Sequence, residues 1–451
     1  MRLPSILKDL LPSDSVKQLM DLVNQPNLVS GLKDAAQQLG WKEAWGTTQL
    51  QHAMMQTKKW METFNARWTS ENHDTLRLGV NATGLLLSSR WSSVPLSSQA
   101  ISTHAVVAGG YSEPNAIAQD LYGLLFSLTG GQACVVTHSV EQALVLLRQA
   151  LPAGKRWAIP RADSIRLASG CDLVTLLSLE NSNIIEIGAS NTCTAEDFAK
   201  AFEAGAGGFV SVEPTRLSDS NSNVDRSETL AIQKAKEYRV PVVEVLLNGS
   251  LIDLASLGIA TPVARNRLNA GADAVVLSGD GWFGGPPCGV IVGRDAFVKP
   301  LVDIAQRLGM TAHPLLMATL HATLVAGKDL ATWNQTPLGL MASNGVENLL
   351  QRAKRLAIQI EGTPWVEKIV AASESFPVTT IPNDTLRLDS GVLKIEPRGI
   401  SVKDLQAKLA ARETPIWCLA DDRHLTIVLR SIEPADDREI VAAFEPSPSP
   451  Q

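Results

Sequence analysis

Three glycines, Gly279, Gly281 and Gly284, follow an apolar segment with the spacing of a loop that binds the diphosphate of a dinucleotide. Such a loop holds phosphate at the N-terminus of a helix that begins within it. Here two prolines come next, and the apolar segment 289–293 begins after one more residue. Because no helix fits in between, we expect two strands joined by a glycine-rich connection, and no dinucleotide site.

A second group of polar residues could bind an anion. Thr137, His138 and Ser139 come between an apolar strand pattern and a helical pattern. The first N–H groups of a helix are free to bind an anion. The same residue types are also common as simple helix caps, so both interpretations stay open.

The composition is that of a soluble protein with a large core: 45% of the 451 residues are apolar and 19% are charged. The length predicts two or three domains.

A net charge of −6 excludes a global positive field that would attract nucleic acid. Five dispersed cysteines without a CxxC pair predict reduced thiols, a cytoplasmic location and no metal site or disulfide framework. No apolar run approaches the roughly 18 residues of a membrane span, and the first residues lack the apolar core of a signal peptide.

The elements that must position these residues follow from the hydrophobic patterns. Residues 1–75 are predicted to be amphipathic helices, in which the tryptophans pack between helices. Residues 76–330 alternate strand and helix patterns and predict a large α/β domain on a mainly parallel sheet. Helical patterns fill 301–370, and strand patterns begin at about 375, so 331–445 is predicted to be a small α+β domain. Residues 446–451 are predicted to be a disordered tail.

Several segments resemble one known family, and they do so in the family's order. The loop reads Ser278-Gly279-Asp280-Gly281 and then, after two more residues, Gly-Gly-Pro-x-x-Gly before an apolar strand. This is similar to bacterial selenocysteine synthase, the L-seryl-tRNA(Sec) selenium transferase family of fold-type I pyridoxal-phosphate (PLP) proteins. The segments "VNATGLLL", "GGYS", "LTGGQACVVTHSVEQALVLL" and "PVVEVLLNGSLIDL" also match. The resemblance implies a fold-type I PLP-transferase-like large domain with a helical N-terminal region and a small C-terminal domain.

The same resemblance shows two losses at the groups on which PLP chemistry depends. The family's Schiff-base lysine falls at Gly281, and its pyridinium-binding aspartate falls at Val245. A primary amine is needed to form the aldimine, and a carboxylate keeps the ring an electron sink. Glu244 is next to Val245 but faces the other side of a strand. We therefore expect no catalytic residue and no bound cofactor, although PLP is the cofactor of the family.

Further departures concern the phosphate cradle and possible substitutes for the lysine. The resemblance leaves Thr137, His138, Ser139 and Ser278 as vestiges of the cofactor site. Glu141 in that cradle would repel a phosphate. Lys299 is predicted on a helix beyond the next strand, and Lys234 and Lys236 on an exposed helix, so none is expected to replace the lost amine.

Three functions stay open from the sequence. The first is a PLP-free relative of selenocysteine synthase with a binding or scaffold role, whose vacated space holds water, repacked side chains such as Trp282 and Phe283, or a new ligand. The second is an active L-seryl-tRNA(Sec) selenium transferase that takes a lysine from elsewhere. The third is different chemistry in the vacated pocket, carried by polar groups such as Asp280, His138, Glu213 and Cys288. The family resemblance implies a homodimer or a larger ring of dimers and makes tRNA a possible partner, and no membrane association is expected.

Overall fold

The computed structural model describes residues 78–445, except 89, 92, 168, 179–183, 191, 214–227 and 382–383. The chain divides into two compact units, Met1–Gly79 with Ala411–Pro415, and Val80–Ala410 with Ile416–Gln451. All helices and strands given below belong to the second unit. The helices expected over 1–75 and the tail expected over 446–451 lie outside the described residues, and the predicted domain boundaries stay predictions.

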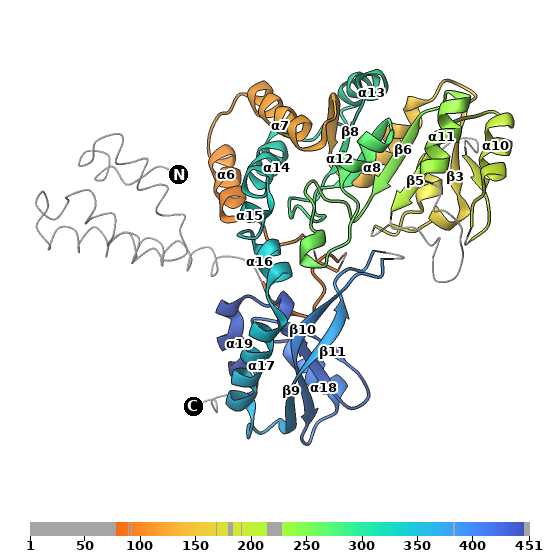
Figure 1. Ribbon diagram of the computed structural model, residues 1–451. Helices are drawn as coiled ribbons and strands as arrows, with labels where there is room; N and C mark the ends of the chain where they lie inside the picture. Colours follow the sequence, from red (N-terminus) through yellow and green to blue (C-terminus); the bar gives the residue numbers. More distant parts are fainter. Residues whose placement is uncertain are drawn as a thin grey trace, which may run out of the picture. The chain divides into compact units, whose positions relative to one another are not determined.

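A seven-stranded sheet in the order β2-β8-β7-β6-β5-β3-β4 forms the α/β part of the chain (Figure 1). β8 runs antiparallel to both neighbours, and the other strands are parallel. The mainly parallel sheet that the alternating patterns predicted is therefore confirmed. Its strands are β2 (Ala133–Thr137), β3 (Arg156–Pro160), β4 (Ile184–Ile187), β5 (Ala206–Glu213), β6 (Val242–Leu246), β7 (Ala274–Ser278) and β8 (Gly289–Gly293).

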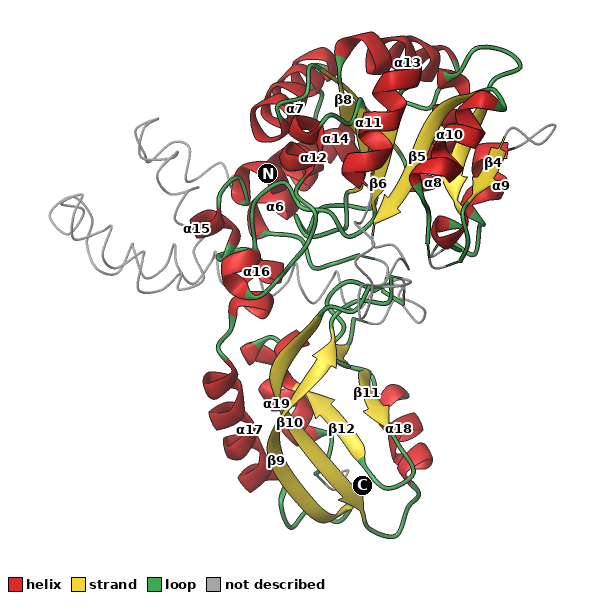
Figure 2. Cartoon of the chain, turned by 45° about the vertical axis from the view of Figure 1, so that its right-hand side comes forward, coloured by secondary structure: helices red, strands yellow, loops and turns green. Residues whose placement is uncertain are grey.

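Helices cover both faces of this sheet, which is why its central strands are apolar on both sides (Figure 2). One face packs against α8 (Val140–Leu147), α9 (Leu173–Ser178) and α13 (Asp295–Arg307). The opposite face packs against α7 (Pro114–Thr129), α10 (Ala195–Glu203), α11 (Glu228–Tyr238), α12 (Ala264–Ala270) and α14 (Pro314–Ala326). The remaining helices of this part are α6 (Ser98–Ala108), which packs on α14, α15 (Leu330–Trp333) and α16 (Pro337–Ser343).

A second sheet, of five strands in the order β1-β11-β12-β10-β9, forms the C-terminal α+β part. It consists of β1 (Val80–Ala82), β9 (Val366–Pro377), β10 (Arg387–Pro397), β11 (Ile416–Ala420) and β12 (Leu425–Val428), with α17 (Val346–Ile360), α18 (Val402–Ala410) and α19 (Asp437–Ala442). β1 pairs in parallel with β11, so the segment near Val80, expected in the α/β region, joins this sheet. Strand structure begins at Val366, so the helical pattern expected up to 370 ends earlier than predicted.

Two local predictions in this part are confirmed. Ser401 caps α18, because its Oγ accepts the N–H of Asp404 at 3.1 Å. The predicted hairpin around "ADDRH" is the antiparallel pair β11–β12, closed by a bond from the N–H of Asp421 to the carbonyl of His424 at 3.0 Å.

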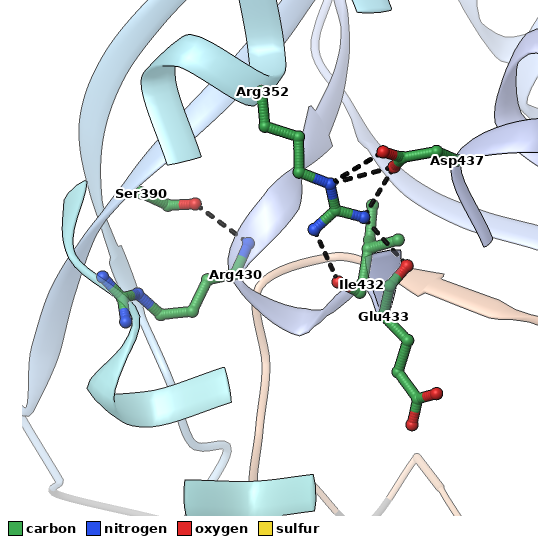
Figure 3. A network of polar contacts seen from close by, with 6 residues as sticks. All are labelled: Arg352, Ser390, Arg430, Ile432, Glu433 and Asp437. Atoms are coloured by element: carbon green, nitrogen blue, oxygen red, sulfur yellow. Dashed lines mark hydrogen bonds and ion pairs between the residues drawn. The ribbon is translucent and has the colours of Figure 1, made fainter. Parts of the chain in front are cut away.

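Two buried arginines tie the C-terminal elements together (Figure 3). Arg352 on α17 donates from Nε to both carboxylate oxygens of Asp437, at 2.9 and 3.0 Å, and from Nη1 and Nη2 to the carbonyls of Ile432 and Glu433, each at 2.8 Å. Arg430 donates to the backbone carbonyls of Met341, Ala342 and Asp389. In the described part of the chain, no helix is long and apolar enough to cross a membrane.

Candidate functional site

A cavity of about 480 Å³ lies at the carboxyl ends of several strands of the large sheet. Ser139 follows β2, Arg166 follows β3, Leu247 follows β6, and Ser278 ends β7. Residues from 86–94 and 380–381 complete its wall. Ligands of open α/β sheets bind at this edge, and cavities of this size hold small molecules.

Backbone hydrogen bonds hold the glycine loop between β7 and β8. The N–H of Gly279 donates to the carbonyl of Cys288 and the N–H of Gly285 to that of Gly279, both at 2.8 Å, and the N–H of Gly281 donates to the carbonyl of Ser278 at 3.1 Å. β7 is followed directly by β8, so the expected pair of strands joined by a glycine-rich connection is confirmed.

Two glycines of this loop differ in whether a larger residue would fit. At Gly279 a Cβ would lie 2.2 Å from the Pro286 carbonyl oxygen and 2.3 Å from Cys288 Sγ, so no larger residue fits. At Gly281 the closest atoms to a Cβ would be the carbonyl oxygens of Ser278 at 3.1 Å and Gly249 at 3.4 Å, and its φ is not left-handed. Gly281 lines the cavity. A side chain is thus missing at a position where the backbone accepts one with a small adjustment.

The four residues expected as vestiges of the cofactor site do not all lie at the cavity. Ser139 caps α8 by accepting the N–H of Gln142 at 3.2 Å, and it lines the cavity with Glu141 of the first helical turn. Thr137 is fully buried and donates its hydroxyl to the carbonyl of Ser139 at 2.8 Å. His138 is exposed and is not part of the cavity wall. Of the predicted group, Ser139 and Ser278 therefore meet at the cavity, while Thr137 and His138 do not.

Val245 lies in the centre of the large sheet. It pairs with Val212 on one side and Val276 on the other, is fully buried, and belongs to the apolar core beneath α8 and α13. Glu244 faces the opposite side, toward Arg267 of α12, as strand alternation predicted. Val245 itself therefore offers no carboxylate to this core.

Glu244 belongs to a buried acid–base cluster with Glu213 and Arg267. Arg267 approaches Glu213 at 3.6 Å and Glu244 at 3.5 Å. The Oε2 atom of Glu244 is buried without a hydrogen bond. Desolvation, and then repulsion from Glu213, outweigh the contact with Arg267 and raise the pKa of Glu244 to about 7. Glu213 is thus part of the packing on this face of the sheet and does not line the cavity.

Lysine is not among the described residues that line the cavity. Lys299 is exposed on α13, on the helix predicted for it. Lys234 forms an ion pair with Glu237 at 2.7 Å on α11, and Lys236 is exposed on the same helix.

Sequence patterns did not reveal two residues of the cavity wall, Arg166 and Trp91. Arg166 follows β3, a strand that the patterns missed; had the strand been recognised, its carboxyl end would have placed Arg166 at the binding edge. Trp91 lies in an irregular segment and packs on Trp417 of β11, with ring centroids 4.9 Å apart. No local signal predicts that contact.

Comparison with known proteins identifies the family of this chain. Residues 113–433 match the family model of the L-seryl-tRNA selenium transferases. The chain belongs to this family. It is 26% identical over 383 residues to the L-seryl-tRNA(Sec) selenium transferase of Geobacter metallireducens, which covers 82% of this chain and 83% of the relative. The counterpart from Moorella thermoacetica is 24% identical over 402 residues, with 84% and 83% covered.

A solved structure supports the fold. D-glucosaminate-6-phosphate ammonia-lyase superposes with a TM-score of 0.59 at 15% identity, covering 82% of this chain and 95% of the lyase. The predicted fold, a PLP transferase of fold type I, is confirmed. PLP is the cofactor of the L-seryl-tRNA selenium transferase family.

The residues around the cavity of this family member do not fit PLP. Gly281 offers no amine, and Val245 offers only methyl groups within an apolar core. Glu141 lies in the first turn of α8, where its charge opposes a phosphate. Trp282 and Phe283 are buried in two other clusters, so neither fills the cavity.

The polar groups considered for different chemistry do not all meet. Asp280 and Cys288 line the cavity, whereas His138 and Glu213 do not. The Cys288 thiol is buried, and its pKa is raised by desolvation and then by Asp280, which opposes a thiolate nucleophile. Among the described residues, no group of three or more His, Cys, Asp or Glu is arranged to hold a metal ion.

Proposed function

We propose that this chain is a PLP-free member of the L-seryl-tRNA selenium transferase family that binds a ligand in its cavity without forming a Schiff base. The observation that carries the proposal is Gly281 in the cavity wall, at the position of the family's lysine, with no lysine among the other described lining residues. A protein without an amine at this place cannot form the internal aldimine that PLP chemistry needs.

A second change supports the same function. Val245 is fully buried among apolar side chains, and burying it stabilises the fold by roughly 1.5–3 kcal/mol. An aspartate there would bury a charge without a partner once the pyridinium is gone. The two replacements are consistent with each other, because each removes a group that is useful only when the cofactor is bound.

The test is a titration of the purified full chain with PLP, followed by visible absorbance and by borohydride reduction with mass spectrometry of the peptides. We expect no aldimine absorbance and no pyridoxylated lysine, while the Geobacter metallireducens relative, treated in parallel, serves as the positive control. A stoichiometric pyridoxylated peptide from this chain would overturn the proposal.

The competing function is an active selenium transferase with a lysine from elsewhere, for example from another subunit. Lys299, Lys234 and Lys236 all lie on helices away from the cavity wall. The borohydride experiment separates the two functions, because a borrowed lysine would be labelled at one position and in a stoichiometric amount.

The assembly and partners are part of the same proposal. We expect a homodimer or a larger ring of dimers in the cytoplasm, with a binding or scaffold role in which tRNA is a possible partner. The net charge of −6 opposes strong binding to RNA. Light scattering of the purified chain measures the assembly, and filter binding at two salt concentrations measures any affinity for tRNA.

A further inference from the structure

Two charged side chains in the cavity wall have no partner among the residues that the structure describes. Glu141 on α8 and Arg166 after β3 both line the cavity. Within the described part of the chain, neither side chain makes a hydrogen bond or an ion pair, and no ion pair joins them to each other. Charged groups in a concave site without partners are available for a ligand that carries the opposite charges.

The rest of the wall is mainly apolar, with a few hydroxyl groups. Asp280 adds a second carboxylate, but it already accepts a hydrogen bond from the hydroxyl of Ser278. The apolar part of the wall includes Leu86, Leu87, Trp91, Val94, Leu167 and Leu247. The cavity therefore offers one positive group, one free and one partly engaged negative group, and an apolar lining.

We propose that this cavity binds a free amino acid with an apolar side chain, as a zwitterion. Arg166 binds the ligand carboxylate through its planar fork of N–H donors. Glu141, with Asp280 nearby in the wall, accepts the ligand ammonium. The ligand side chain lies against the leucines and Trp91. This inference rests on the proposed PLP-free function, because bound PLP would occupy the same space.

The charges of the wall oppose the other ligand classes. A phosphate monoester carries about two negative charges at neutral pH, and it would face two carboxylates and one guanidinium. A simple amine would leave Arg166 without a partner, and a simple carboxylate would leave Glu141 without one. Only a ligand with both groups satisfies both unpaired side chains.

The experiment is isothermal titration calorimetry on the full chain with matched probes. L-leucine, L-phenylalanine and L-methionine are the zwitterions. Isoamylamine and isocaproate are leucine without its carboxylate and without its ammonium, and inorganic phosphate is the anionic probe. We expect at least one of the three amino acids to bind, and each single-charge analogue of leucine to bind about tenfold or more weakly than leucine.

Four variants show whether the binding uses the cavity. Glu141→Gln and Arg166→Gln are each expected to weaken the best amino acid about tenfold or more. Glu367→Gln on β9 and Arg307→Gln on α13 make the same chemical changes at exposed positions outside the cavity wall, and we expect them to leave the affinity unchanged.

Three outcomes overturn the inference: no binding of any of the three amino acids, binding that Glu141→Gln and Arg166→Gln leave intact, or tighter binding of phosphate than of the amino acids. The calorimetry is independent of the absorbance and borohydride assays. A failure of amino-acid binding with a negative PLP test refutes only the ligand class, whereas a labelled lysine refutes the proposed function itself.

Discussion

The C-terminal part of the chain and the cavity differ in whether their charged side chains have hydrogen-bond or ion-pair partners. In the C-terminal part, Arg352 and Arg430 are buried, and all three nitrogens of each guanidinium donate hydrogen bonds. Figure 3 shows the bonds of the Arg352 guanidinium. In the cavity, Glu141 and Arg166 have no partner among the described residues. A buried charge with a full set of partners holds elements together, whereas an unpaired charge at a cavity makes no hydrogen bond or ion pair that joins two elements.

This difference separates positions that maintain the architecture from positions that are free to change function. The α+β part and the glycine loop keep the family fold, with Gly281 and Val245 at the positions where the sequence resemblance places the cofactor groups. The loop keeps its shape through backbone bonds and Gly279, and neither depends on what stands at position 281. Glycine at position 281 is therefore compatible with an intact fold.

The largest effect is expected from breaking the arginine network. Arg352→Met leaves Asp437 and two backbone carbonyls without their donor, and removing one partner of a buried pair costs about 3–5 kcal/mol. Urea denaturation measures the loss. Arg355→Met on the exposed side of the same helix is the matched control and should change stability by less than about 0.5 kcal/mol. Equal effects of the two variants would contradict the view that the hydrogen bonds of Arg352 hold the C-terminal elements together.

The next effect distinguishes two glycines of one loop. Gly279→Ala forces a methyl group against the Pro286 carbonyl and Cys288 Sγ, so we expect a loss of about 3 kcal/mol, at the upper end for overpacking. Gly281→Ala requires only a shift of a few tenths of an ångström, so we expect about 1 kcal/mol or less. Thermal unfolding of both variants measures the difference. If Gly281→Ala is as damaging as Gly279→Ala, glycine stands at 281 for a structural reason and its presence says nothing of function.

How far the sequence predicts this molecule depends on whether a feature is local. The strands around 133–137, 242–246 and 274–278 were predictable because most of their residues are apolar and several are β-branched. The segment "RWAIP" of β3 was not, since only three apolar residues stand between Arg156 and Pro160, and pairing with β4 and β5 establishes the strand.

The same holds for the site. Gly281, Val245, Glu141 and Ser278 could be located because they lie inside or beside family motifs. Arg166 and Trp91 could not, because their place in the cavity results from contacts between segments far apart in the chain. His138 shows the converse: its position in the sequence was suggestive, but the start of α8 leaves it in solvent.

Glu244 lies between the two cases of the comparison, because it is buried and only partly paired. Its pKa is about 7 in the folded chain, above the value of 4.5 that it has when exposed, so the folded state holds a proton that the unfolded state has lost. Stability from this group is fully present below pH 4.5 and is lost as the pH rises through 7. We expect a decrease of about 2 kcal/mol between pH 5 and pH 8.

Urea denaturation at several pH values measures this decrease, and Glu244→Gln is the comparison variant. The amide is neutral at every pH, so the variant should lose this part of the decrease and be more stable than the wild type at pH 8. An unchanged pH dependence in the variant would assign the decrease to other groups.

The smallest effect is expected from the cavity charges. It tests directly whether Glu141 and Arg166 lack a structural role. If Glu141 and Arg166 have no structural role, Glu141→Gln and Arg166→Gln should each change the free energy of unfolding by less than about 0.5 kcal/mol, as substitutions without partners do. Urea denaturation without ligand measures this. A loss of 2 kcal/mol or more would mean that a partner within the chain holds these groups. At the same concentration of a bound amino acid, the wild type should gain more stability than either variant, because the variants bind it more weakly.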